Sequence, residues 1–147
     1  MRDAMGGSVV LIIIVMFIVI ALGYMAFNVN YTKAFRMKNK VISVYEDYDG
    51  ECLSSCRGTI KDYARTIGYS SANGFRCPEG YSQVDNLYCI KKMTVQTSGV
   101  DGIVKDMKVK SYYKVITKIN VEIPIINNIL DLNVFYIKGD TKSFEEG

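Results

Sequence analysis

The chain has 147 residues, with 18 Lys and Arg, 15 Asp and Glu, and a net charge of +3. So small a charge does not suggest a nucleic-acid-binding protein, and no nucleic acid partner is expected. Histidine is absent, which excludes His-based acid–base catalysis, Ser–His and Cys–His nucleophile pairs and histidine metal sites. Because no other catalytic set and no phosphate-binding loop is visible, we predict neither enzyme activity nor a cofactor.

Residues 1–7 read MRDAMGG and form a short leader-like segment that ends in two glycines. Ser8 is a suitable N-cap residue, because its hydroxyl can accept a hydrogen bond from the first helical turn. We therefore expect a helix to begin at Ser8.

Residues 8–27 contain the strongest signal, an uncharged run of 19 residues from Val9 to Phe27. As a helix this run would be roughly 28 Å long, close to the thickness of the bilayer hydrocarbon. A helix that is apolar on every face is typical of a membrane span or a filament core rather than of a soluble protein. A removable signal peptide is the alternative, but its apolar region is normally about 7–15 residues long, behind a basic start.

Residues 28–50 predict an amphipathic continuation of the same helix. They contain no Gly or Pro before Gly50, and their apolar residues recur at helical spacing. Those residues are Ala34, Met37, Val41, Val44 and Tyr48. One helix is therefore expected from Ser8 to Tyr48, with Gly50 at its C-terminal end.

Residues 51–147 predict an α+β globular domain. A short second helix is expected from Gly58 to Ile67, with one apolar stripe and Gly68 at its end. The stripe consists of Ile60, Tyr63, Ala64 and Ile67. A loop from Tyr69 to Tyr81 follows.

From Tyr88 onward the apolar residues alternate with polar ones, which is typical of half-buried strands. We predict a strand from Tyr88 to Thr97, a turn at 98–102, and a long strand from Met107 that bends once and ends at Pro124. A connection at 125–130 and a strand from Leu132 to Lys138 precede a polar tail. The prediction is an antiparallel sheet of three or four strands, with one face covered by the amphipathic half of the long helix.

Four cysteines occur, and all lie in the predicted domain: Cys52, Cys56, Cys77 and Cys89. An even number beside a membrane helix favours disulfides and an extracytoplasmic domain. We predict the pairs 52–56 and 77–89, although spacing alone leaves all three pairings open. Zinc is the alternative, but four thiolates on zinc usually come in two close pairs with two-residue gaps.

Two charged clusters lie in the amphipathic segment, a basic one in its first half and an acidic one at its end. Lys33, Arg36, Lys38 and Lys40 would by the positive-inside tendency keep that flank cytoplasmic, against the cysteine argument, to which we give more weight. Contact of this basic cluster with anionic headgroups, or with carboxylates of neighbouring subunits, is the other interpretation. The acidic cluster Glu46, Asp47, Asp49 and Glu51 lacks the spacing of a calcium-binding loop, so no metal is expected.

The order of these features carries a resemblance to a known family. A glycine-ended leader, a helix half apolar and half amphipathic, and a small disulfide-linked sheet resemble the type IV filament superfamily. Within it the chain is similar to tight-adherence (Tad) type pilin-like proteins of Gram-positive bacteria. The resemblance lies in GGSVVLIIIVMFIVIALGYMAFNVNYTKAFRMKNKVI and, more weakly, in FYIKGDTK near the end.

The resemblance implies a leader cut at Gly6 or Gly7, and a helix that leaves the bilayer to pack against other pilin subunits or copies of itself. The family usually has a glutamate shortly after the cut, whereas residues 9–13 of this chain are all aliphatic, and Met5 stands where a basic residue is common. The residues expected to make the assembly contacts are Val9, Ile13, Phe17, Ile20, Tyr24 and Phe27.

The expected function is a structural subunit, major or minor, of a surface filament, with an extracellular C-terminal domain. The alternative is a single-pass, membrane-anchored extracytoplasmic binding or accessory protein.

Overall fold

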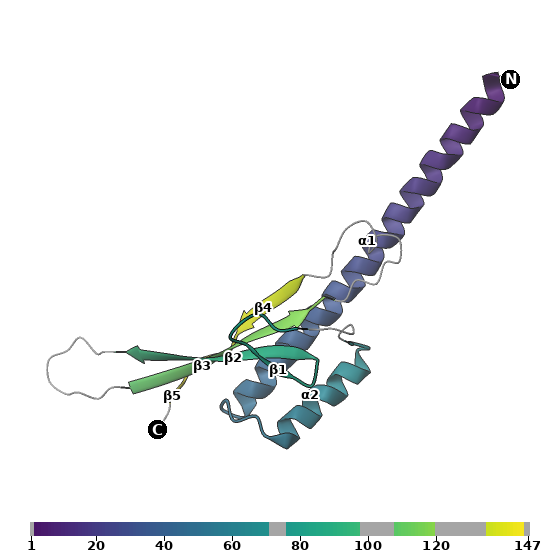
Figure 1. Ribbon diagram of the computed structural model, residues 1–147. Helices are drawn as coiled ribbons and strands as arrows, with labels where there is room; N and C mark the ends of the chain where they lie inside the picture. The colour runs from purple at the N-terminus through teal and green to yellow at the C-terminus, as the bar shows by residue number, and fades with distance from the viewer. Residues whose placement is uncertain (1, 71–75, 98–107, 120–134, 146–147) are drawn as a thin grey trace.

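The computed structural model describes residues 2–70, 76–97, 108–119 and 135–145. A long helix carries a compact head made of a second helix and an antiparallel sheet (Figure 1). This confirms the α+β prediction, although the sheet has five strands rather than the predicted three or four. The elements are α1 (Arg2–Asp47), α2 (Ser54–Thr66), β1 (Ser82–Val84), β2 (Tyr88–Thr97), β3 (Lys108–Lys118), β4 (Tyr136–Asp140) and β5 (Phe144–Glu145). The sheet order is β1-β2-β3-β4, and β5 pairs with β3 beside β4.

α1 is one unbroken helix of 46 residues, about 69 Å long. It begins at Arg2, so the prediction of a start at Ser8 is wrong, and the leader-like segment is helical. Gly6 and Gly7 each cost about 1 kcal/mol relative to alanine in a helix. Extending an existing helix nevertheless avoids the cost of nucleation, which allows the helix to continue through both glycines.

The lower half of α1, residues 28–47, packs on the sheet through the apolar face that the sequence predicts, whereas the upper half is residues 2–27. Ala34, Met37, Val41 and Val44 are all buried. Tyr48 is the exception, because it is exposed and Tyr45 is buried in its place. The helix ends at Asp47, so the backbone turns away before Tyr48, whereas Tyr45 lies one turn after Val41 on the buried face.

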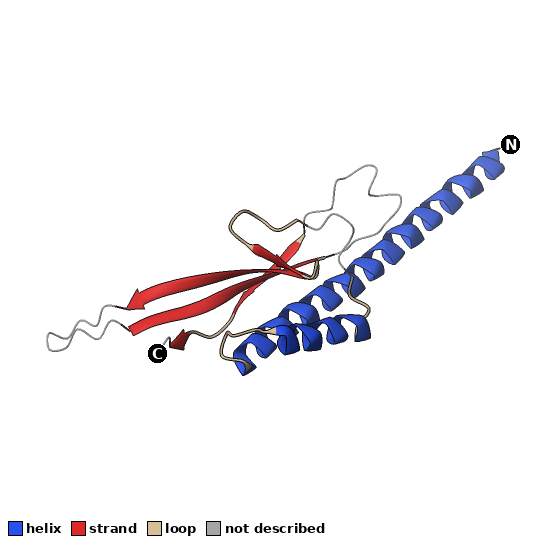
Figure 2. Cartoon of the chain, turned by 60° about the horizontal axis from the view of Figure 1, so that its bottom comes forward, coloured by secondary structure: helices blue, strands red, loops and turns tan. Residues whose placement is uncertain are grey.

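The sheet turns alternate residues of β3 toward α1, and Ser111, Val115 and Thr117 are buried there. The lower half of α1 lies across β3 and β4, with α2 alongside it (Figure 2). The Thr117 hydroxyl donates a hydrogen bond of 3.0 Å to the backbone carbonyl of Ala34, so the strand and the helix are joined by a buried polar contact as well as by packing. The predicted bend before Pro124, the turn at 98–102 and the connection at 125–130 lie outside the described residues.

α2 begins at Ser54, four residues before the predicted start at Gly58. The Cys52–Cys56 disulfide joins the residue before the N-cap to the first turn of α2. The predicted stripe is correct, since Ile60 and Ala64 are buried and Tyr63 and Ile67 are half-buried against the core. Gly68 follows with a positive φ of 62°, the conformation that ends many helices.

Both disulfides join the predicted partners. Cys77–Cys89 lies on the sheet face opposite α1, where Cys89 and Ile116 form a small second cluster that Tyr81 and Tyr136 partly cover. The bond closes a loop of about a dozen residues with little core of its own, a constraint worth about 3 kcal/mol in the chain-entropy model.

The C-terminal part differs from the prediction in two ways. β4 is Tyr136–Asp140, two residues further along than the predicted end at Lys138. The expected polar tail contains β5, in which Phe144 is buried against the Tyr113 ring at 6.2 Å between centroids. The backbone N–H of Lys142 donates to the Glu46 carboxylate at 2.7 Å, which fixes the tail to the end of α1.

Three buried tyrosines connect the helices to the sheet. The Tyr69 hydroxyl lies within hydrogen-bond distance of the Lys118 carbonyl (3.0 Å) and the Leu87 carbonyl (3.2 Å), and the hydroxyls of Tyr45 and Tyr88 are 3.4 Å apart. Burial raises the pKa of Tyr69 to about 12 and also raises the pKa values of Tyr45 and Tyr88. The head therefore keeps these phenols protonated well into the alkaline range.

Substitution by alanine should change the stability of the head in opposite directions at Gly50 and at Gly58. A Cβ at Gly50, where φ is 84°, would lie 2.7 Å from the Tyr113 ring, whereas a Cβ at Gly58 in α2 would meet nothing within 4 Å. We expect Gly50→Ala to lower the unfolding free energy of the head by about 1–2 kcal/mol, and Gly58→Ala to raise it by about 0.5–1 kcal/mol. Urea unfolding of the two variants measures the difference, and equal effects would contradict the placement of both residues.

The tyrosines predict a loss of stability at high pH. Below about pH 10 they are protonated in both the folded and the unfolded chain, so their full contribution is present. Above about pH 10 the unfolded chain releases protons that the folded chain retains until its raised pKa, so stability falls by about 1.4 kcal/mol per pH unit for each tyrosine. Urea midpoints across this range should show a shallower decline for Tyr69→Phe than for the wild type, and an equal decline would refute the role of Tyr69.

Candidate functional site

The most unusual surface of the molecule is the upper half of α1, which projects from the head (Figure 1). Every large apolar side chain from Val9 to Ile20 is at least half exposed, and Phe17 is 72% exposed. These side chains lie on all sides of the helix, because they are consecutive in the sequence. Exposed apolar area of this size marks a surface that another molecule or a membrane covers.

The predicted assembly residues lie within this surface. Val9, Ile13, Phe17, Ile20 and Tyr24 are separated by three or four residues, so they form one continuous seam along α1. All five are exposed. A second helix could therefore pack along the seam without displacing any part of the head.

Phe27, the sixth predicted assembly residue, is placed differently. It is partly buried against the core of the head, and its ring meets Phe135 edge to face at 6.0 Å. Phe27 also begins a row of rings one turn apart, with Tyr31 and then Phe35 stacked at 6.4 and 6.3 Å. This row was not predicted, although its spacing of four residues is visible in the sequence.

Gly6 and Gly7, the predicted cleavage positions, lie in the upper half of α1, far from the head. A Cβ at Gly7 would meet nothing within 4 Å, so no packing requires glycine there. Cleavage at either residue stays a prediction.

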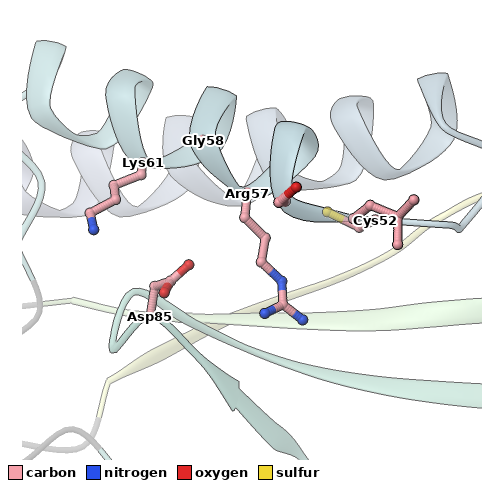
Figure 3. Close-up of a pocket in the computed structure, with 7 residues that line it drawn as sticks. Cys52, Arg57, Gly58, Lys61 and Asp85 are labelled. Carbon is pink, nitrogen blue, oxygen red and sulfur yellow. The ribbon is translucent and has the colours of Figure 1, made fainter.

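An open hollow of about 460 Å³ lies between α2 and the turn that joins β1 to β2. Arg57 and Lys61 extend from α2 toward Asp85 on the turn (Figure 3). Arg57 also lowers the pKa of the buried Tyr88 hydroxyl slightly, and Asp85 raises it slightly, beside the larger effect of burial. The hollow holds no nucleophile paired with a base, and no three His, Cys, Asp or Glu residues come together in the described part of the chain.

The predicted basic cluster lies where α1 enters the head. The Lys33 ammonium donates to the Gly68 carbonyl at 3.3 Å, Lys38 lies over the Phe35 ring, and Lys40 lies over the Tyr63 ring. Three of the four basic side chains therefore have contacts within the head that orient them. The acidic cluster lies at the opposite end of the head, where Glu46 binds the backbone of Lys142.

Comparison of the chain with protein-family models, with curated proteins and with solved structures finds no match. The part of the chain described contains one helix, α1, that is long and apolar enough to cross a membrane. This agrees with a single-pass anchor by length and composition.

A charge in the middle of the exposed stretch should weaken its transfer into lipid. A lysine at the centre of a membrane helix costs about 3 kcal/mol relative to an apolar residue, which offsets part of the gain from the aliphatic residues around it. We expect Phe17→Lys to raise the share of the protein that alkaline extraction releases from membranes. Ser43→Lys, at an exposed position of α1 beside the head, is the matched control and should stay in the membrane. Equal retention of the two variants would show that the upper half of α1 does not enter lipid.

Proposed function

We propose that this chain is a structural subunit of an extracellular filament of the type IV, tight-adherence kind. The observation that carries the proposal is the continuity of α1, whose exposed upper half and buried lower half form one helix without a break. A flexible tether would suffice for a simple membrane anchor, whereas a rigid shaft holds each head at a set position relative to its neighbours.

In the proposed mechanism, the upper half of α1 exchanges contact with lipid for contact with neighbouring subunits. Before assembly, lipid covers the apolar upper half of α1, and the head lies outside the membrane. In the filament, the seam from Val9 to Tyr24 packs against the same helix of other subunits. Both surroundings are apolar, so the exchange leaves little apolar surface in water at either stage.

The two disulfides support an extracytoplasmic head. All four cysteines of the chain are paired, as is usual for domains in oxidising compartments. The role proposed is structural, and the hollow between α2 and the β1–β2 turn offers charged groups without a catalytic arrangement.

The alternative is a single-pass, membrane-anchored binding or accessory protein. The all-aliphatic stretch at residues 9–13 favours it, because a helix without any charge is fully compatible with permanent residence in lipid. In that case the seam would face lipid throughout.

Cysteine cross-linking separates the two functions, because the native chain has no free thiol. We expect the double variant Ile13→Cys/Tyr24→Cys, oxidised on intact cells, to give a ladder of multimers in the sheared surface fraction. The matched control, Ser43→Cys/Thr59→Cys, places both thiols at exposed positions beside the head and should give no ladder.

Protein confined to the membrane fraction as monomers would contradict the filament and favour the anchor. The intact mass of the sheared protein gives a further readout of the same experiment. A chain that begins at Gly7 or Ser8 supports leader cleavage, and an intact MRDAMGG segment excludes cleavage without excluding a filament.

A further inference from the structure

A groove lies between α1 and the C-terminal end of α2, and its charged and polar lining is not explained by the packing of either helix. Its volume is about 450 Å³, within the roughly 300–1,000 Å³ range of small-ligand sites. It is lined by Asn28, Val29, Thr32, Lys33, Arg36, Thr66 and Ile67. Two cations, an amide and two hydroxyls thus surround a small apolar floor, and none of the lining residues is acidic.

We propose that this groove binds the phosphate of an anionic phospholipid, with Lys33 and Arg36 holding the headgroup and its acyl chain lying along α1. The inference rests on the membrane-inserted stage of the proposed function. It goes beyond that function because it assigns a specific lipid site to the head.

The position of the groove along α1 supports a headgroup ligand. If the run from Val9 to Phe27 spans the hydrocarbon, the headgroup layer covers roughly the next 5–8 Å of α1. The Cα atoms of Lys33 and Arg36 lie about 9 and 14 Å beyond Phe27 along the helix axis, past this layer. Because side chains on a helix lean toward its N-terminus, both cations reach back toward the depth of the lipid phosphates.

The contacts of the two cations also favour an anion. Lys33 has one N–H on the Gly68 carbonyl, at 3.3 Å, so its ammonium is held at the groove with donors to spare. Arg36 is exposed, and its guanidinium can bind two phosphate oxygens at once. Among the described residues no ion pair joins either side chain to a carboxylate, and the nearby Asp62 pairs with Arg65 at 3.7 Å.

The apolar floor of the groove continues up the helix. Val29, Met25 and Leu22 are separated by four and three residues, so they share one face of α1, and each is at least 55% exposed. An acyl chain attached to a headgroup in the groove would lie along this face. This continuity favours a lipid over a soluble phosphate compound.

Native mass spectrometry of the full chain in detergent tests the proposal, with phosphatidylglycerol and phosphatidylcholine as the added lipids. We expect the wild type to retain phosphatidylglycerol in preference to phosphatidylcholine. Lys33→Gln/Arg36→Gln should weaken that retention at least tenfold, because two charge-assisted contacts are removed. Arg57→Gln/Lys61→Gln is the matched control, since it removes one Arg and one Lys from the other end of α2 and should retain the lipid.

Equal retention by the two double variants, or equal retention of the two lipids, would overturn the proposal. If inorganic phosphate at a similar concentration displaces the lipid, the groove recognises phosphate without the acyl chain, and the lipid assignment is wrong. Arg36→Gln alone serves if loss of the Lys33 contact disturbs folding, and far-ultraviolet circular dichroism checks this.

The test is independent of filament formation, because mass spectrometry is made on single chains in detergent. Alkaline extraction of membranes first shows whether the same chain integrates into the bilayer. A chain that does not integrate into membranes would contradict the membrane stage of the proposed function. A chain that integrates but does not distinguish the lipids would contradict the lipid site alone. If Lys33→Gln/Arg36→Gln instead loses the cross-linked ladder without any change in lipid retention, the groove contacts an acidic surface of another subunit, and the lipid site is refuted.

Discussion

The structure depends on one helix having two different surroundings. Hydrogen bonds along the backbone of α1 are the same from one end to the other, but Ala34, Met37 and Val41 are fully buried while Ile13 and Phe17 are largely exposed. A helix needs no tertiary contact to satisfy its own backbone, so it can leave the head and still enter an apolar medium at no hydrogen-bonding cost. Both the filament and the anchor hypotheses follow from that property.

Much of the fold could be predicted because it depends on local periodicity. The uncharged run and the buried face from Ala34 to Val44 follow from the helical repeat, and β2 follows from alternation. Tyr45 and Tyr48 both fit the apolar face of the helix. Which of the two is buried depends on where the helix ends. β5 has two residues, too few for any period, and its position depends on contacts of the tail with Glu46 and Tyr113.

The candidate site was predictable to a similar extent. The seam on α1 lies within one segment, so its helical spacing is visible in the sequence. The ring of Phe27 instead contacts Phe135, which is more than a hundred residues away in the sequence. The groove combines Lys33 and Arg36 with Thr66 and Ile67 of another helix. No local pattern links these segments, because their proximity results from the packing of α2 against α1.

The buried hydrogen bond from Thr117 to the Ala34 carbonyl has a mechanical consequence. It joins the central strand of the sheet to α1 inside the head, about two turns below Phe27. A pull along the helix axis would therefore load this bond and the surrounding side chains in parallel, as a shear, rather than opening them one after another. The same bond resists rotation of the helix about its axis, so a torque applied to the shaft would turn the whole head with it.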